Sequence, residues 1–451
     1  MDKQHHKSSH AHILARGAFT HLILELQHAV SDQGYHTPTP IQEQTIAHLL
    51  DGRDLIGCAQ TGTGKTAAFI LPILQYLIKN SRFRVKGKTR VLILAPTREL
   101  AAQIGDSIKD YGRYLKVLYT VIFGGVGQNP QVHALAQGMD IVVATPGRLL
   151  DLMNQRHIHL DGIEIFVLDE ADRMLDMGFI HDVQRIIAKL PKKRQTLFFS
   201  ATMSPEVVKL SEKIVNNAVF VSVSPDKPTV ESIAQKVFFV DKNHKDALLA
   251  QLLEAKHWSR VLVFVQMKHA ADKVVERLRE LKIGAAAIHG NKSQNARTGA
   301  LAKFKLGQIR VLVATDIAAR GIDVDSISHV INYDLPNTTE TYVHRIGRTA
   351  RAGAGGDAVS FCSAPERDYL RAIEKMLRAV IPVDRSHSFH SHAAEIATGA
   401  AAQPLPRGKG RPIHKVNAAG RKPVAKNKKY PPHWAQWKKN KKDKRHCSTR
   451  Y

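Results

Sequence analysis

One stretch of the chain has the residue types and spacing of a loop that binds phosphate. Residues 59–66 read Ala-Gln-Thr-Gly-Thr-Gly-Lys-Thr, between a short apolar run and a second run that suits a helix. Gly62 and Gly64 let the backbone curl so that several N–H groups point at one anion, and the following helix dipole adds positive field. Lys65 supplies a charge for the outer phosphates and Thr66 a hydroxyl for Mg²⁺. Ala59 stands where the strict pattern has Gly. A flexible surface turn is the alternative interpretation, which the flanking strand and helix disfavour.

A pair of neighbouring carboxylates forms the second candidate. Asp169 and Glu170 directly follow the apolar run 165–168. Downstream of a phosphate loop, Asp169 would complete a Mg²⁺ shell, and Glu170 would orient or deprotonate an attacking water. Capping of a helix that begins near Ala171 is the structural alternative, and the two roles are compatible.

Two arginines near the end of the apolar pattern form the third candidate. Arg348 and Arg351 stand three residues apart, so on a helix they would face the same way. Charge that develops on a transferring phosphoryl group needs cations that arrive when the site closes, and a second domain could offer them. A solvated basic helix face or a contact to a phosphate backbone is the alternative.

The elements that must position these residues form an α/β pattern. The runs 91–94, 141–144, 165–168 and 196–199 are continuously apolar, as in parallel strands covered on both faces, and helical patterns separate them. This predicts a doubly wound sheet, whose ligands lie at the carboxyl ends of its strands. The pattern restarts with runs at 261–265, 286–289, 311–314 and 330–332, so we expect a second α/β unit without a phosphate loop.

The same pattern sets the expected domain limits. We predict a disordered lead at 1–18, a first α/β domain at 19–222 and a linker at 223–232. A second α/β domain at 233–384 and a basic disordered tail at 385–451 follow, because the apolar period stops near residue 385.

Charge is unevenly spread over the 451 residues. The formal net charge is +26, and residues 404–451 hold 16 Lys and Arg against the single acid Asp443, or +15. Such a balance predicts polyanionic partners, nucleic acid first and an acidic membrane second. Three widely spaced cysteines favour a reducing, cytoplasmic setting, and no apolar run is long enough to span a membrane.

The ordered motifs resemble those of the DEAD-box ATP-dependent RNA helicases, superfamily 2 proteins with two RecA-like domains. The resemblance covers about residues 19–365. Beyond the phosphate loop, its first-domain motifs are residues 34–42, Pro-Thr-Arg-Glu-Leu at 96–100, Gly124-Gly125, Thr-Pro-Gly-Arg at 145–148, Asp-Glu-Ala-Asp at 169–172 and Ser-Ala-Thr at 200–202. Second-domain motifs are residues 263–265, 289–297, 314–316, 320–323 and 344–351. Asp172 marks this branch of helicases, and the short second domain with its basic extension looks most like the bacterial RhlE-like group.

The resemblance implies a role for each motif residue. Phe19 and Gln42 would contact adenine. The phosphate loop would hold the triphosphate through Ala59, Gln60, Thr61, Gly62, Thr63, Gly64, Lys65 and Thr66, and Asp323 would reach the ribose. Thr66 and Asp169 would hold Mg²⁺, Glu170 would serve the water, and Arg348 and Arg351 would act as fingers. Ser200 and Thr202 would couple nucleotide state to RNA state. The RNA path, with backbone and 2′-OH contacts, would be lined by Pro96, Thr97, Arg98, Gly125, Thr145, Arg148, Gln294, Arg297 and Thr315.

Two positions depart from the family pattern. Phe19 lies about two residues closer to Gly34 than the usual aromatic residue, and Ala350 stands where the family usually has Gly.

The implied function is RNA-stimulated ATP hydrolysis that locally unwinds or remodels RNA duplexes and RNA–protein complexes. ATP and RNA together would close the two domains. A DNA translocase and a non-enzymatic RNA clamp that uses ATP as a lock are the two rivals. The tail, with Tyr430, Trp434 and Trp437 among its lysines, would add affinity for RNA. Ribosomal precursors or the RNA decay machinery are possible partners, and the oligomeric state stays open.

Overall fold

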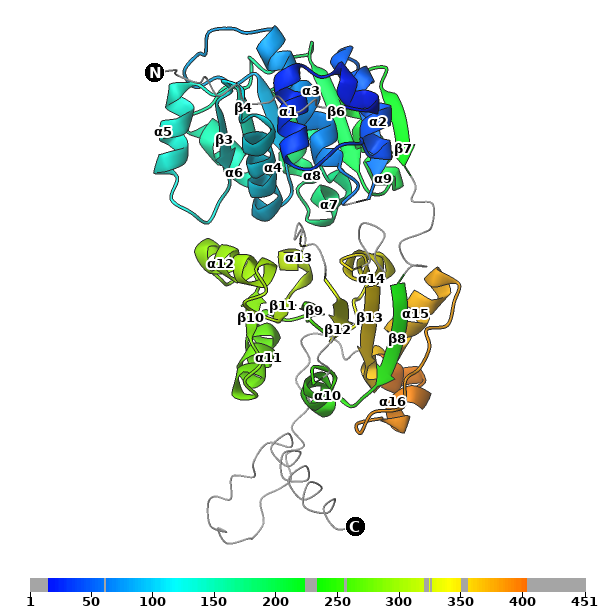
Figure 1. Ribbon diagram of the computed structural model, residues 1–451. Coiled ribbons are helices and arrows are strands. Elements are labelled where there is room, and N and C mark those ends of the chain that lie inside the picture. Colours follow the sequence, from blue (N-terminus) through cyan, green and yellow to red (C-terminus); the bar gives the residue numbers. More distant parts are fainter. Residues whose placement is uncertain are drawn as a thin grey trace, which may run out of the picture. The chain divides into compact units, whose positions relative to one another are not determined.

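A computed structural model describes residues 15–60, 62–223, 233–254, 258–319, 324, 327–349 and 356–403 of the chain. These residues divide into two compact units, one that ends by 223 and one that begins at 233. Figure 1 shows one sheet with covering helices in each unit. None of the helices in the described part of the chain is both long and apolar enough to cross a membrane.

The first unit is built on a seven-stranded parallel sheet with the order β3-β4-β2-β5-β6-β1-β7. Its strands are β1 Leu55–Ala59, β2 Val91–Leu94, β3 Tyr119–Ile122, β4 Ile141–Ala144, β5 Ile165–Leu168, β6 Gln195–Ser200 and β7 Val219–Val223. Its helices are the short η1 Gly17–His21 and α1 Leu24–Asp32, α2 Pro40–Leu50, α3 Lys65–Lys79, α4 Arg98–Tyr111, α5 Asn129–Gln137, α6 Pro146–Asn154, α7 Ala171–Asp176, α8 Ile180–Ile187 and α9 Pro205–Ile214.

Alternate residues of the central strands feed two separate cores. Val91 and Ile93 of β2 face the core that η1 and α1 to α4 cover, whereas Leu92 and Leu94 face the core under α6 to α9. All four side chains are fully buried. Burial on both faces explains why the run is continuously apolar instead of alternating.

The second unit repeats the design with a six-stranded parallel sheet of order β10-β11-β9-β12-β13-β8. Its strands are β8 Ile233–Phe239, β9 Val261–Phe264, β10 Ala285–Ile288, β11 Val311–Ala314, β12 His329–Asn332 and β13 Gly356–Cys362. Its helices are α10 Lys245–Leu252, α11 Lys268–Glu280, α12 Gln294–Lys305, α13 Asp316–Ala319, α14 Thr339–Ile346, α15 Arg367–Leu377 and α16 His392–Ile396, with short turns η2 Lys242–His244, η3 Ala364–Glu366 and η4 Gly399–Ala402.

The predicted fold class, two parallel-sheet α/β units, is confirmed. Every apolar run named from the sequence coincides with a strand over most of its length. Strands β3, β7, β8 and β13 lie outside those runs, and β7 extends to Val223, one residue into the predicted linker. The rest of that linker, 224–232, lies outside the described residues.

The limits of both predicted disordered ends need correction, because the lead predicted at 1–18 overlaps a helix and the tail predicted at 385–451 overlaps packed residues. Near the N-terminus, η1 starts at Gly17, and the backbone N–H of Ala18 donates to Glu43 Oε2 at 2.9 Å. Near the C-terminus, residues 385–403 pack on the second unit and are not part of a disordered tail. Residues 1–14 and 404–451 lie outside the described residues.

Backbone pairing holds this C-terminal strap, residues 385–403, because its side chains are mostly small or polar. The N–H of Ser391 donates to Phe239 O at 3.0 Å, and Arg371 donates to Ala397 O at 2.8 Å. Ala394 and Ala402 are fully buried. His387 is buried against the Phe238 ring, with 5.2 Å between ring centroids, and neither of its ring nitrogens has a hydrogen-bond partner in the described residues.

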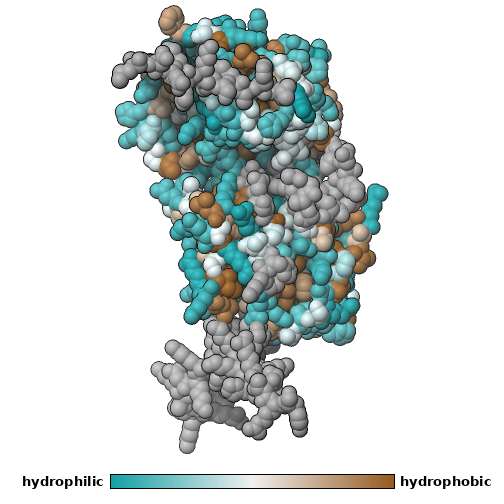
Figure 2. Space-filling model, viewed as in Figure 1, coloured by the Kyte–Doolittle hydropathy of each residue, from teal (hydrophilic) through white to brown (hydrophobic). Residues whose placement is uncertain are grey.

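Large apolar side chains on the surface are scattered. Phe83, Phe220 and Val380 are exposed but come from segments far apart in the sequence, the loop before β2, strand β7 and the segment after α15. In Figure 2 the hydrophobic areas of the visible face are interspersed with hydrophilic ones. Polar and charged surfaces are therefore the natural place to look for binding sites.

We predict that the C-terminal strap loosens in mild acid. Burial lowers the pKa of His387, His390 lowers it further, and Asp384 opposes them. The neutral ring is thus favoured in the fold, so its stabilisation is complete above about pH 6.5 and declines as the pH falls through the lowered pKa. Hydrogen exchange of residues 385–403 should therefore be faster at pH 5.5 than at pH 7.5, after correction for intrinsic rates.

A His387→Phe variant should abolish this pH dependence, while the exposed control His181→Phe should leave it intact. Equal protection of the wild-type strap at both pH values would contradict the prediction.

Candidate functional site

Strand order gathers the predicted site residues of the first unit at one edge of its sheet. All seven strands are parallel, so the residues that follow them share the carboxyl edge. The phosphate loop follows β1, Asp169 follows β5, and β6 ends at Ser200. Pro96 to Arg98 follow β2, and Thr145 follows β4. Nucleotide motifs thus lie above β5-β6-β1, and the predicted RNA motifs above β3-β4-β2.

The phosphate loop has the backbone that its glycines permit. Gly62 and Gly64 have φ of +83° and +91°, and Gly64 is the N-cap of α3. Lys65 Nζ, on a buried side chain, donates to Ala59 O at 2.5 Å, and Thr63 Oγ1 donates to Gln60 O at 2.8 Å. The lysine is therefore folded back over its own loop, while Thr66 is partly exposed in the first turn of α3. Thr61 lies outside the described residues.

Gln42 is fastened to this loop. Its Oε1 accepts from the N–H of Thr39 at 2.9 Å, and its Nε2 donates to Gly64 O at 3.1 Å. A primary amide has two N–H donors and two acceptor lone pairs, so one donor and one acceptor remain for a ligand. A Cβ on Gly64 would stand only 2.5 Å from Nε2, so Gly is required there for this contact as well as for its positive φ.

Asp169 and Glu170 are both buried, and each has a different partner. Asp169 Oδ1 accepts from the N–H of Glu170 at 2.9 Å. Burial raises the pKa of Asp169 to about 7, against the nearby charge of Lys65, which lowers it. Glu170 Oε2 forms a 2.7 Å ion pair with Arg173. The acid that would serve the water is thus held by a cation one helical turn away.

Glu170 also carries backbone strain. Its φ of 53° and ψ of 52° are left-handed, a conformation that costs a residue with a side chain about 1–3 kcal/mol. This turn places Asp169 at the end of β5 and starts α7 directly afterwards. Strain of this kind persists where surrounding contacts fix the geometry, as in many active sites.

Asp172 joins the turn after β5 to the turn after β6. Its Oδ2 accepts from the N–H of Ala201 at 3.2 Å and from both the N–H and the hydroxyl of Thr202, at 3.0 and 3.1 Å. Ser200 Oγ donates to Thr202 O at 2.7 Å. Of the predicted coupling residues, Thr202 therefore binds the Asp172 carboxylate, and Ser200 Oγ accepts from the backbone N–H of Asp172 at 3.4 Å.

The predicted RNA residues of the first unit meet around one loop. The Arg98 guanidinium lies so close to Gly125 that a Cβ there would stand 2.0 Å from Nη1. Arg148 donates to Val126 O, in the same loop, at 3.2 Å. Thr97 caps α4, and Thr145 is the N-cap residue of α6. Buried Pro96 precedes Thr97. These contacts form one cluster from three segments far apart in sequence.

The second unit repeats this arrangement at its own carboxyl edge. Gln294 is the first residue of α12, after β10, and Arg297 lies one turn later on the same helix. Thr315 follows β11, and its N–H donates to Ile288 O of β10 at 3.3 Å. All three predicted RNA residues therefore follow the neighbouring strands β10 and β11.

Arg345 is the centre of this edge, a role that the sequence did not reveal. Its buried guanidinium makes two bonds to Asp316, at 2.6 and 2.9 Å, and further bonds to Asn332 Oδ1 and Asp334 O. It also lies over the Phe264 ring at 5.0 Å. Arg173 was missed in the same way. Helical spacing is the available signal, because Arg345 shares the buried face of Tyr342 and Ile346, and Arg173 stands three residues after Glu170.

The helical placement predicted for Arg348 is wrong. Helix α14 ends at Ile346, Gly347 is its C-cap, and Arg348 lies in the following turn, where its side chain is buried. Helical spacing therefore gives no reason for Arg348 and Arg351 to face the same way. Arg351, Ala350 and Asp323 lie outside the described residues.

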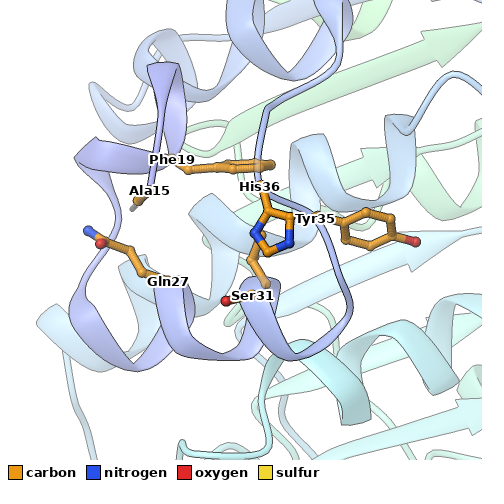
Figure 3. A pocket seen from close by; sticks show the side chains of 7 residues that line it. Ala15, Phe19, Gln27, Ser31, Tyr35 and His36 are labelled. Carbon is orange, nitrogen blue, oxygen red and sulfur yellow. The ribbon is translucent and has the colours of Figure 1, made fainter. Parts of the chain in front are cut away.

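Phe19 is held in the first unit's core. Its ring, on η1, lines a small pocket with Gln27, Ser31 and His36, and Figure 3 shows it above the His36 ring. The side chain is 2% exposed, so a contact with adenine stays a prediction.

Comparisons with known proteins agree with these motifs. The DEAD/DEAH box helicase family model matches residues 39–210, and the helicase conserved C-terminal domain model matches residues 244–353. The ATP-dependent RNA helicase RhlB of Pseudomonas putida is 45% identical over 358 residues, which cover 78% of this chain and 90% of that protein. The chain belongs to the DEAD-box ATP-dependent RNA helicases. Members of this family hydrolyse ATP.

Further matches support the assignment of the chain to this helicase family. The ATP-dependent RNA helicase SrmB of Haemophilus influenzae is 41% identical, over 79% of this chain and 82% of its own length. Among solved structures, S. cerevisiae Dbp5 bound to RNA and ADP BeF3 matches with a TM-score of 0.71 and 32% identity, covering 80% of this chain and 94% of that one. The DEAD-box helicase Mss116 bound to ssRNA and UDP-BeF matches with a TM-score of 0.72 and 29% identity. This match covers 83% of this chain and 79% of that one. The RhlE-like placement stays a prediction.

We predict that Asp172→Asn uncouples the helicase. The amide keeps the size of the side chain but exchanges one acceptor oxygen for a donor, so bonds to Ala201 and Thr202 or to the N–H of Arg173 must break. We expect a loss of about 1–3 kcal/mol in unfolding free energy. The ratio of ATP turnover with and without RNA should fall about tenfold or more. The exposed control Asp106→Asn should change neither quantity, and a wild-type ratio in Asp172→Asn would refute the coupling role.

Proposed function

We propose that this chain hydrolyses ATP in an RNA-stimulated manner and uses the cycle to unwind short RNA duplexes and remodel RNA–protein complexes. The observation that carries the proposal is the gathering of Gln42, Lys65, Asp169 and Glu170 at one half of a sheet edge. The RNA cluster around Gly125 occupies the other half of the same edge. The relatives of this chain have names that describe ATP-dependent RNA helicases, in agreement with both halves of this sheet edge.

In this proposal the side chains divide the reaction among them. Gln42 reads adenine with its remaining donor and acceptor, and Lys65 leaves Ala59 O to neutralise the outer phosphates. Glu170, oriented by Arg173, takes a proton from the attacking water. Arg348 and Arg351 of the second unit act on the developing phosphoryl charge, and Asp323 contacts the ribose. Phe19 supports the adenine site from η1.

The residues also fit Mg²⁺. Asp169 is a buried carboxylate whose raised pKa reflects burial without a full counter-charge, which a divalent cation would supply. Within the described residues, no three His, Cys, Asp or Glu side chains gather into a metal site. Mg²⁺ suits such a place because it keeps several waters and binds through one or two protein groups plus phosphates. Thr66 and Asp169 would hold it, and when bound it would neutralise charge on the phosphates.

RNA is proposed to lie along Arg98, Gly125 and Arg148 in the first unit and Gln294, Arg297 and Thr315 in the second. The set contains cations, hydroxyls and backbone groups but no aromatic ring, which suits sugar–phosphate contacts and sequence-independent binding. Ribosomal precursors or decay intermediates would be suitable substrates. The three widely spaced cysteines agree with a cytoplasmic location.

ATP turnover with and without RNA tests the proposal. Turnover should rise at least tenfold with saturating single-stranded RNA, and Glu170→Gln should lower it about a hundredfold or more because the proton acceptor is lost. The same variant should stay on RNA longer in the presence of ATP, since release depends on hydrolysis. Glu212→Gln, an exposed change on α9, is the control.

Three outcomes separate the rivals. Equal turnover with and without RNA would refute the proposal. An unchanged residence time for Glu170→Gln would favour a clamp that does not need hydrolysis. Equal competition by DNA and RNA of one sequence would favour a DNA translocase.

Deletion of residues 404–451 should weaken RNA binding and spare basal ATP turnover. The deletion removes a net charge of +15, so the slope of log affinity against log salt should flatten. Titration of one RNA at several salt concentrations measures this, with the full-length helicase as reference. An unchanged slope would show that the tail does not contact RNA.

A further inference from the structure

A basic hollow lies at the opposite edge of the first sheet from the phosphate loop. Its volume is about 640 Å³, and the segments around it are those that precede β1, β6 and β7, three neighbouring strands. Because these strands are parallel, the segments meet at the amino edge. A rise of about 3.3 Å per residue puts the hollow about 15 Å from the phosphate loop. Neither the nucleotide motifs nor the RNA cluster reaches it.

The charged side chains that line this hollow are almost all positive. Arg53, Lys192, Lys193, Arg194 and Lys213 line it, against the single carboxylate of Asp54. Both carboxylate oxygens of Asp54 already accept backbone hydrogen bonds. Oδ1 accepts from the N–H of Thr196 at 2.7 Å, and Oδ2 accepts from the N–H of Asn216 at 2.6 Å. Within the described part of the chain, none of the five cations forms an ion pair with a carboxylate.

The hollow is built on a fixed frame. Arg194 donates to Pro191 O at 2.6 Å and to Ile214 O at 3.3 Å, and its guanidinium lies 6.0 Å from the centroid of the Phe166 ring. Its Nε is buried and has no hydrogen-bond partner among the residues that the structure describes. Gln195 Nε2 donates to Leu49 O and Arg53 O, which ties the loop before β1 to that before β6. The positive charges therefore surround a defined concave surface.

We propose that this hollow binds the sugar–phosphate backbone of RNA that flanks the segment held at the carboxyl edge. The proposal rests on the proposed function, since it adds a second contact for the same RNA. Lysine and arginine side chains bind phosphate without reading sequence, and the lining contains amides and a threonine but no aromatic ring on which a base could stack. A bound phosphate would also supply the counter-charge that the five cations lack.

Charge reversal at the two exposed lysines tests this in the full-length helicase. Lys192→Glu/Lys193→Glu changes the local charge by four without disturbing the bonds of Arg194 or Asp54. The matched control is Lys86→Glu/Lys116→Glu, which makes the same change at exposed loops that precede β2 and β3, at the same sheet edge but outside the hollow. Each protein is titrated with two RNAs. The long RNA is a hairpin with single-stranded extensions, and the short RNA is a ten-nucleotide single strand.

The test variant should bind the long RNA about five- to tenfold more weakly than the control at 100 mM salt, with a salt slope smaller by about two. ATP turnover stimulated by the ten-nucleotide strand should match the control, and thermal unfolding should show that both variants fold. Equal affinity of both variants for the long RNA would overturn the proposal and leave an acidic protein as the partner to seek. Lack of RNA stimulation in the wild type would instead refute the proposed function.

Discussion

The buried carboxylate of Asp172 is the contact on which the first unit's site depends. A carboxylate removed from water must be satisfied by donors, and this one finds three of them on Ala201 and Thr202. The same turn of chain carries Asp169 and Glu170, and Glu170 is held in a left-handed conformation. A shift of the Ser200–Thr202 segment therefore either breaks these bonds or moves the turn that positions the acid. That is a physical route by which RNA could alter hydrolysis.

Strand order explains why this bridge stands where it does. In the first unit the predicted nucleotide motifs follow β5, β6 and β1, and the predicted RNA motifs follow β3, β4 and β2, so β2 and β5 form the boundary. The second unit has the same division, with the predicted RNA residues after β10 and β11 and Arg348 after β12 and α14. There Arg345 crosses the boundary, from α14 to Asp316 next to Thr315. A buried charge thus fixes the carboxyl edge of each unit. In the first, the Asp172 carboxylate joins two segments of the nucleotide half, and in the second the Arg345 guanidinium joins the two halves.

The sequence reveals the strands and motifs better than it reveals these bridges. Continuous apolar runs predicted the parallel sheets, because double burial leaves a local trace in the sequence. Arg345 leaves a weaker trace, because its partner Asp316 becomes its neighbour only after folding, whereas Arg173 stands three residues after Glu170 and so had a local signal that was missed. The strap at 385–403 leaves almost none, because backbone bonds and small buried side chains hold it. The end of α14 at Ile346 was missed because the basic run 344–351 gives no periodic signal. The roles of Thr61, Asp323 and Arg351 remain predictions from motif position alone.

The helicase also uses its cations in two different ways. Arg173 and Arg345 are buried and paired with carboxylates, so each fixes one geometry, and added salt screens such buried pairs little. The cations of the hollow before β1, β6 and β7 are mostly exposed and form no ion pair with a carboxylate of the described residues, so they create a field that added salt weakens. Geometry at the carboxyl edge should therefore govern the chemical step, and the uncompensated charge should govern how firmly RNA is held. Because the two sets of cations share no residue, capture of RNA and hydrolysis of ATP can be altered independently.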